Sequence, residues 1–306
     1  MNNSAQWINY MLLFGVMIVW GMNVVAIKVL VEYVPPAAMQ SWRILLAGLV
    51  LAVIISIKGE WRRLTKKQAV YITFASLTGV TAHHLFLAFG LANTTAVNGS
   101  LIVALVPIFT SILALLILGD PFTRIKFIGI ISAFAGVCLV IAAGAGGGLA
   151  SVASGDILMF AAVFAQALSF VFIRKATIDL SPRLVTGIMF VVGSAGLFIF
   201  SALLEPGGLP PLGTIPSGVW WIFLGSSIVA TALGHQVFNL SIQKIGAGET
   251  AVFNNFVPFF GMVSSVLFLG ESIYMLQGVG FVLIVAGVLM GTGYLEQKWI
   301  QKRKAY

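Results

Sequence analysis

The sequence predicts an all-α integral membrane protein whose ten transmembrane helices form two inverted five-helix repeats around a central cavity. Three observations predict this fold. The chain is 59% hydrophobic and only 8% charged, so it lacks the polar residues that cover a water-soluble globule. Its apolar residues gather into ten segments of bilayer length. The pattern of the first half returns in the second.

The ten segments are separated by polar, glycine or proline residues. A bilayer core about 30 Å thick needs about 20 apolar residues per helix, and each segment has about that length. The first is too long for a signal-peptide core and follows no basic region, so we expect it to remain as a span. Only residues 93–95 divide the third segment from the fourth. The expected spans are 10–31, 37–57, 69–92, 96–118, 124–144, 156–176, 183–204, 218–242, 247–269 and 275–294.

The positions of lysine and arginine predict the orientation, because cytoplasmic loops carry the positive excess. With both termini in the cytoplasm, all of the 17 basic residues except Lys28 and Arg43 fall in cytoplasmic loops or the C-terminal tail. An odd number of spans would break this pattern. Since no organellar presequence is evident, we expect a multi-pass protein of a prokaryotic plasma membrane.

The glycine-rich residues 144–155 divide the spans into five and five, so the expected repeats are 1–148 and 149–306, the second ending in a basic cytoplasmic tail. A displacement of 151 residues aligns Pro107 with Pro258 and His84 with His235 without a gap. Because five is odd, the second repeat enters the membrane from the opposite side. Inverted repeats are typical of secondary transporters, whose substrate site lies near the midplane between the halves.

The chain resembles the EamA-type members of the drug/metabolite transporter superfamily over nearly its whole length. The resemblance lies in the duplicated set of motifs, with one departure, since the family usually has Glu where the first copy has Asp120. It implies ten helices around a central cavity and transport of metabolites, often efflux of amino acids or related compounds. The motifs are Trp20-Gly21-Met22-Asn23, Arg43, Pro107, Leu118-Gly119-Asp120 and Gly129/Gly136, then Pro258, Leu269-Gly270-Glu271, Gly280 and Gly287.

Polar residues at membrane depth are the candidate substrate ligands, because burial in lipid is costly for them. Each could instead only bond a neighbouring helix. Trp20 and Asn23 share one face of the first span, where an indole could stack on a substrate while the amide orients it. Histidine titrates near neutral pH, so proton coupling through His84 or His235 stays open. The predicted cavity residues are Trp20, Asn23, His84, Asn98, His235, Asn239 and Asn254.

Other intramembrane residues have expected structural roles. Arg43 requires an acid or an anionic substrate group, and we favour a structural or gating ion pair with Glu32 or Glu205. Pro107 and Pro258 should kink their helices and free a backbone carbonyl four residues earlier. In the loops, Asp120 and Glu271 are expected to cap the helix that follows each of them.

The sequence has no nucleotide-binding loop, no cluster with metal-ligand spacing and a single cysteine, Cys138. We therefore expect no enzyme, catalytic residue, metal, cofactor or nucleic-acid partner; the expected partners are a small-molecule substrate and the bilayer. The favoured function is an alternating-access carrier of an amino-acid-like or amphipathic metabolite, with export implied by the resemblance. Uptake or exchange of nucleotide-sugar-like metabolites, and a membrane protein that transports nothing, are the alternatives. Substrate identity, coupling ion and oligomeric state stay open.

Overall fold

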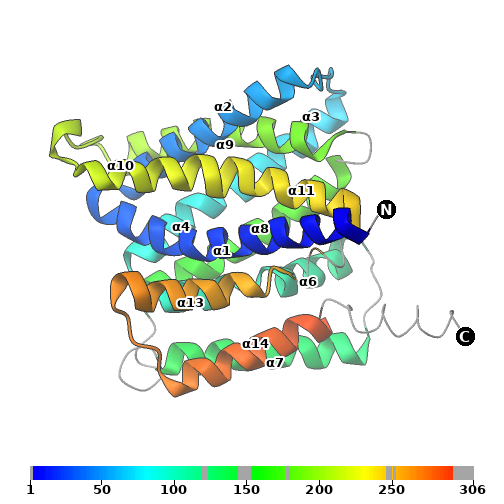
Figure 1. Cartoon of the computed structure of the whole chain (residues 1–306), viewed down its shortest axis with the longest axis vertical. Helices are drawn as coiled ribbons and strands as arrows, with labels where there is room; N and C mark the ends of the chain where they lie inside the picture. The colour runs from blue at the N-terminus through cyan, green and yellow to red at the C-terminus, as the bar shows by residue number, and fades with distance from the viewer. Residues whose placement is uncertain are drawn as a thin grey trace, which may run out of the picture.

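The structure is a computed structural model that describes residues 3–118, 123–143, 153–176, 180–245, 250 and 253–291. These residues form helices that run side by side along one direction (Figure 1). In chain order the elements are α1 (Asn3–Tyr33), α2 (Pro36–Ile57), α3 (Lys66–Ser76), η1 (Leu77–Ala82), α4 (His83–Ala92), α5 (Ala96–Val103), α6 (Val106–Leu118), α7 (Arg124–Ala143), α8 (Ser154–Ala176), α9 (Pro182–Leu204), η3 (Leu212–Thr214), α10 (Ser217–Leu224), η4 (Gly225–Leu233), α11 (Gly234–Ile245), α13 (Phe256–Leu269) and α14 (Met275–Gly291).

The helices follow the apolar segments of the sequence closely. Eight stretches in the described residues are long and apolar enough to cross a membrane, and α13 and α14 are shorter apolar helices. The turn expected at residues 93–95 is confirmed, since α4 ends at Ala92 and α5 begins at Ala96. Thr95 caps α5 by accepting a hydrogen bond from the backbone N–H of Asn98. The expected boundary at 148/149 and the basic tail lie outside the described residues.

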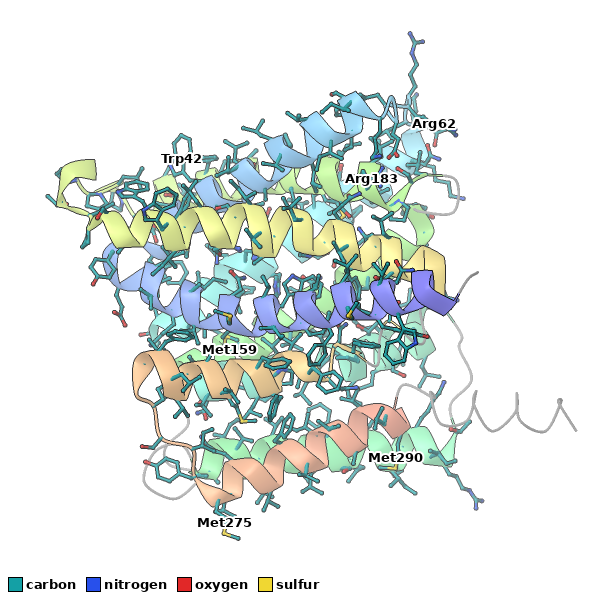
Figure 2. The ribbon with its side chains drawn as sticks, in the orientation of Figure 1. Trp42, Arg62, Met159, Arg183, Met275 and Met290 are labelled. Carbon is teal, nitrogen blue, oxygen red and sulfur yellow. The ribbon has the colours of Figure 1, made fainter. Side chains whose placement is uncertain are left out.

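Large apolar side chains cover the outer surface of the bundle. Trp221 is 74% exposed and Met275 is 89% exposed, and Figure 2 shows Met275 and Trp42 pointing away from the helices. A continuous apolar exterior of this kind is stable in contact with lipid and unstable in water. The described residues therefore form a multi-pass membrane protein.

Contacts between helix ends define the two ends of the bundle. At the first, Glu205 at the end of α9 accepts hydrogen bonds from the backbone N–H groups of Ala37 and Ala38 in α2, at 2.8 Å each. At the second, Glu60 after α2 pairs with Arg183 at the start of α9. We call these the Glu205 end and the Glu60 end; they lie at the left and right of Figure 1. Helices α2 and α9 are therefore antiparallel neighbours.

The core consists of helix pairs that join distant parts of the sequence. Helix α1 packs against α11, η4 and α13, whereas α8 packs against α3, η1, α4, α5 and α6. Helix α7 pairs with α14 at one side of the bundle (Figure 1). A Cβ atom on Gly287 would lie 2.6 Å from the carbonyl oxygen of Gly129, and one on Gly136 would lie 2.6 Å from that of Gly280. The glycines of each helix are seven residues apart and so lie on one face, where they permit close contact between the two helices.

Glu271 caps a different helix from the one expected. Its two carboxylate oxygens accept hydrogen bonds from the backbone N–H groups of Ala96 and Val97, at 2.8 and 2.9 Å, at the start of α5. The next helix, α14, is capped by Gln277, whose Oε1 accepts from the N–H of Tyr274 at 2.9 Å. The carboxylate still binds the positive end of a helix dipole, but of a helix distant in sequence. Asp120 lies outside the described residues.

Two helices are interrupted rather than kinked at the predicted prolines. The breaks fall at Ala104–Leu105, between α5 and α6, and at Asn254–Asn255, before α13. Pro107 and Pro258 lie in the first turn of the helix that follows each break, where a missing N–H costs no intrahelical bond. The carbonyl of Asn254 is not left free, since it accepts from the N–H of Val257 at 3.1 Å.

Candidate functional site

Two π-helical segments occur at corresponding positions of the two halves. η1 contains six residues and η4 contains nine, and the displacement of 151 residues carries Leu77–Ala82 onto residues 228–233 of η4. π-helical turns are rare and are found frequently at functional sites. Each predicted histidine is the second residue after such a segment, His84 after η1 and His235 after η4.

Arg43 is the centre of a buried polar network that joins α2, α4 and η4. Its side chain is 0% exposed. Nε donates to Oε1 of Gln40 at 2.8 Å, and Nη1 donates to the hydroxyls of Thr231 and Ser226 at 2.7 and 3.3 Å. Nη2 lies 3.1 Å from Nδ1 of His84. We call these five residues the Arg43 network.

The hydrogen bond between Arg43 and His84 fixes the state of the imidazole. A guanidinium has only donors, so Nδ1 of His84 must accept. The ring proton therefore sits on Nε2, which is a donor. His235 has the opposite arrangement, because its Nδ1 lies 2.8 Å from the carbonyl oxygen of Thr231 and must donate to it. Nε2 of the neutral His235 ring is then an acceptor.

The predicted acid partners of Arg43 lie elsewhere. Both oxygens of Glu205 are bonded to the start of α2, and Glu32 is exposed on α1. Within the described part of the chain, Arg43 makes no ion pair and bonds only neutral groups. The expected ion pair is therefore replaced by a set of neutral hydrogen-bond acceptors, which can satisfy N–H groups without neutralising the charge.

Trp20 lies against η4 within a group of rings. Its Nε1 donates to the carbonyl oxygen of Ala230 at 2.8 Å. The indole centroid is 5.0 Å from the ring of His235 and 5.1 Å from that of Phe238, and Phe190 meets His235 edge-on at 5.3 Å. We call Trp20, His235, Phe238 and Phe190 the aromatic group. The backbone carbonyl oxygens of residues 226, 230 and 231 accept hydrogen bonds from side chains. Two of the donors, Trp20 and His235, belong to α1 and α11.

The Arg43 network and the aromatic group share η4. Asn23 joins the network, since its Oδ1 accepts from the hydroxyl of Ser226 at 2.5 Å. Thr231 contacts both sets, with its hydroxyl on Arg43 and its carbonyl on His235. Four predicted residues, Trp20, Asn23, His84 and His235, therefore come together around one π-helical segment.

Three predicted cavity residues lie apart from this centre. Oδ1 of Asn98 accepts from Nε2 of Gln277 at 3.1 Å, which ties α5 to α14. Asn239 donates to Thr186 at 3.3 Å and lines a cavity of about 50 Å³ at the Glu60 end, beside Glu60 and Arg183. Asn254 lies at the break before α13, where its buried Oδ1 has no hydrogen-bond partner among the described residues.

Gln40, Ser226 and Thr231 were not among the residues predicted from the sequence. Gln40 is three residues before Arg43 and so lies on the same helix face, a spacing that could have indicated the contact. Ser226 and Thr231 are five residues apart, which matches the bonding interval of a π-helix rather than an α-helix. Only the π-helical turn brings both hydroxyls to the same guanidinium nitrogen.

Polar contacts are present at both ends of the bundle. At the Glu205 end, Nζ of Lys28 donates to the carbonyls of Leu91 and Thr94, at 2.7 Å each, and the hydroxyl of Thr94 donates to Asp156 at 2.5 Å. At the Glu60 end, Glu60 pairs with Arg183. Helices of the first half thus contact helices of the second half at both ends.

Comparisons with known proteins agree with this fold. The sequence model of the EamA-like transporter family matches residues 7–142 and 153–292. A Bacillus subtilis protein named as the uncharacterized transporter YyaM is 32% identical over 290 residues, 94% of each chain. A Salmonella typhimurium protein named as a probable amino-acid metabolite efflux pump is 29% identical, over 89% of this chain and 91% of that one. A solved crystal structure superposes with a TM-score of 0.64 at 17% identity, covering 93% of this chain and 96% of that one.

The family match and the apolar helices identify a multi-pass membrane transporter, a class of protein distinct from enzymes. The chain belongs to the EamA-like transporter family.

Proposed function

We propose that the protein is a secondary carrier that moves a small amino-acid-like or amphipathic metabolite by alternating access, with the substrate bound around η4. The observation that carries this proposal is the convergence of both halves on that segment. Arg43, His84 and Asn23 approach it from the first half, and Ser226 and Thr231 belong to the second. Secondary transporters bind substrate between their two halves at membrane depth.

The proposal includes ten spans in two inverted repeats, residues 1–148 and 149–306. The helix contacts support it, because α1 meets the second half's α11 and α13 as α8 meets the first half's α4 and α6. The pairs α2 with α9 and α7 with α14 each join corresponding spans. The π-helical segments and the helix breaks also occur at corresponding positions.

Alternating access requires that one end opens while the other stays closed. The contacts between the halves at each end suit this, since Thr94 with Asp156 and Glu60 with Arg183 are side-chain polar bonds that can break and form again. A rocking motion of one half against the other would break one set while it keeps the other. The interrupted helices α5–α6 and α13 provide backbone that can bend.

We place the Glu60 end in the cytoplasm of a cell with the protein in its plasma membrane. That end carries basic residues such as Lys58, Arg62 and Lys66, whereas Asp156 and Glu205 lie at the other. The positive-inside rule then predicts a cytoplasmic N-terminus. Export is the proposed direction, supported by the similarity to the Salmonella typhimurium protein named as a probable amino-acid metabolite efflux pump.

Counterflow in proteoliposomes tests the proposal. A panel of labelled amino acids and amphipathic metabolites is exchanged by the wild type and by the Trp20→Ala, His84→Ala and Trp42→Ala variants, with and without a pH gradient. We expect exchange by the wild type and Trp42→Ala, which changes an outward-facing indole, and loss of exchange by the other two folded variants. A gradient-dependent rate would indicate proton coupling. Normal exchange by Trp20→Ala and His84→Ala would contradict the site, and no exchange of any compound would contradict the carrier.

A further inference from the structure

The guanidinium of Arg43 is buried without a counter-charge. Its side chain is 0% exposed, and its partners in the described residues are an amide, two hydroxyls and an imidazole. Removing an arginine from water is costly unless an anion compensates it. Neutral acceptors satisfy the N–H groups and leave the charge itself uncompensated. The network therefore favours any anion that can reach it.

The unused hydrogen-bonding groups of the network are also donors. Nε2 of Gln40 is buried and has no hydrogen-bond partner among the described residues, while Oε1 of the same amide accepts from Arg43. Nε2 of His84 carries the ring proton, as its bond to Arg43 requires. Amide and imidazole donors beside an uncompensated guanidinium call for an acceptor with negative charge. A planar carboxylate suits this set, because arginine binds it through two parallel N–H groups.

We propose that Arg43, Gln40 and His84 form the subsite for the carboxylate of the transported molecule. This inference rests on the proposed carrier function. It departs from the sequence-based expectation that Arg43 serves an ion pair within the chain.

The surroundings of the subsite indicate the rest of the ligand. The aromatic group lies next to the network through Thr231, and three of its four rings, those of Trp20, Phe238 and Phe190, offer apolar faces. A monocarboxylate with an apolar or aromatic body fits this combination. Multiply charged phosphates would need more cations at this depth; the other intramembrane cation of the described residues, Lys28, is bonded at the Glu205 end.

The subsite belongs to one half and the hydroxyls bonded to it belong to the other, an arrangement that suits binding and release. Arg43, Gln40 and His84 belong to the first half, whereas Ser226 and Thr231, which occupy Nη1, belong to the second. When the halves separate, Nη1 loses these hydroxyls and becomes available to a carboxylate. In the structure, the two hydroxyls accept the hydrogen bonds of Nη1 that a bound carboxylate would accept instead.

Thermal unfolding of the purified protein in lipid nanodiscs tests the subsite with matched probes. The acids are 3-phenylpropionate, 4-methylpentanoate and L-phenylalanine; the controls are 3-phenylpropionamide, 4-methylpentanamide and L-phenylalaninamide. We expect the acids to raise the melting temperature of the wild type at concentrations at least about tenfold below those of the amides, as a charge-assisted bond predicts. No preference for the acids, including no response to either series, would overturn the subsite.

Variants of the network sharpen the test. Gln40→Glu places a carboxylate on Arg43 within the chain, so it should raise the melting temperature without ligand and abolish the response to the acids. Arg43→Gln should abolish the response as well, and the exposed Arg62→Gln, whose side chain points away from the bundle in Figure 2, should retain it. An acid response that persists in folded Gln40→Glu would overturn the proposal. The wild-type comparison needs no variant, so it decides even if Arg43→Gln does not fold.

The counterflow assay separates failure of this inference from failure of the carrier. Exchange of amides and acids at equal rates would leave the carrier intact and remove the carboxylate subsite. Acid-selective stabilisation without exchange of any probe would leave the subsite and remove the carrier.

Discussion

Trp42 and Arg43 are adjacent in the sequence and lie in opposite environments. Successive residues of a helix point about 100° apart, so α2 turns Trp42 outward, 47% exposed, and Arg43 inward, fully buried. Trp42 meets Phe198 edge-on at 5.1 Å on the outer surface, whereas Arg43 bonds two other helical elements, η4 and α4. Membrane depth alone therefore does not decide the role of a residue; the face of its helix does.

Gly234 allows Trp20 to reach η4. A Cβ atom on Gly234 would lie 2.7 Å from Nε1 of Trp20, so Gly234→Ala should displace the indole and weaken its 2.8 Å bond to Ala230. We expect counterflow to fall at least several-fold in this variant while the protein stays folded. Gly225→Ala is the matched control, because that position has open space. Equal rates in the two variants would contradict the placement of Trp20 in the site.

At the scale of single residues, the sequence indicated which side chains avoid lipid but not which partners they contact. Intramembrane polarity identified Trp20, Asn23, His84 and His235, which the structure brings together. It also selected Asn98, whose amide serves a helix contact with Gln277. Polarity within a span indicates only that a side chain avoids lipid. A side chain in the polar centre and a side chain in a contact between helices both avoid it.

Acidic residues that follow one helix cap the start of another helix. Glu271 caps α5 through two backbone N–H groups, and Glu205 does the same for α2. Each carboxylate thus satisfies two donors that a helix end leaves free and compensates the helix dipole. These contacts join the two halves at the Glu205 end.

The contribution of the Glu271 cap can be measured. Glu271→Gln keeps one acceptor oxygen and loses the charge, so the variant should lose about 1 kcal/mol of stability and melt at a lower temperature. Glu32→Gln, which changes an exposed acid at the same end, should melt as the wild type does. Thermal unfolding in nanodiscs compares the two; identical melting would show that the carboxylate does not stabilise α5.

The contact between α7 and α14 depends on glycine at particular positions. Gly287→Leu would force a side chain into the backbone of α7, since even a Cβ atom would lie 2.6 Å from Gly129 O. We expect loss of folded protein on size-exclusion chromatography. Gly278→Leu in the same helix meets open space and should be tolerated. Intact Gly287→Leu protein would mean that the two helices do not pack this closely.

Helix positions were predictable, and their irregularities were not. The length of the apolar segments predicted the bounds of α2 and α9 to within one residue. The π-helical turns of η1 and η4 were not predicted. In η4, Trp20 and Thr231 donate to backbone carbonyls, and the Trp20 contact comes from a helix distant in sequence. The breaks were anticipated as kinks at Pro107 and Pro258, but the chain leaves the helix two or more residues earlier.

The whole molecule combines an apolar exterior with a charge difference between its ends. The sequence indicated this difference, but not how the helices pair, since residues in contact at the site are up to 218 positions apart. Pairings of this kind follow from the three-dimensional arrangement of the two halves. The charge difference between the two ends predicts the orientation of the protein in the membrane.

Labelling of single cysteines checks the orientation. In a Cys138→Ser background, Arg62→Cys at the Glu60 end should react with an impermeant thiol reagent only when the inner face of the membrane is exposed. Gly207→Cys, in the exposed loop after α9, should react in intact cells. The reverse pattern would invert the proposed topology.

The central claim, that two halves open alternately around η4, is tested most directly by closing each end chemically. In the Cys138→Ser background, the pairs Thr94→Cys with Asp156→Cys and Glu60→Cys with Ser181→Cys would be joined by a short cleavable thiol reagent. Both sites are polar contacts in the structure, and the four single-cysteine variants are the controls. We predict that cross-linking either end stops counterflow and that reductive cleavage restores it. Undiminished exchange with either end cross-linked would contradict alternating access.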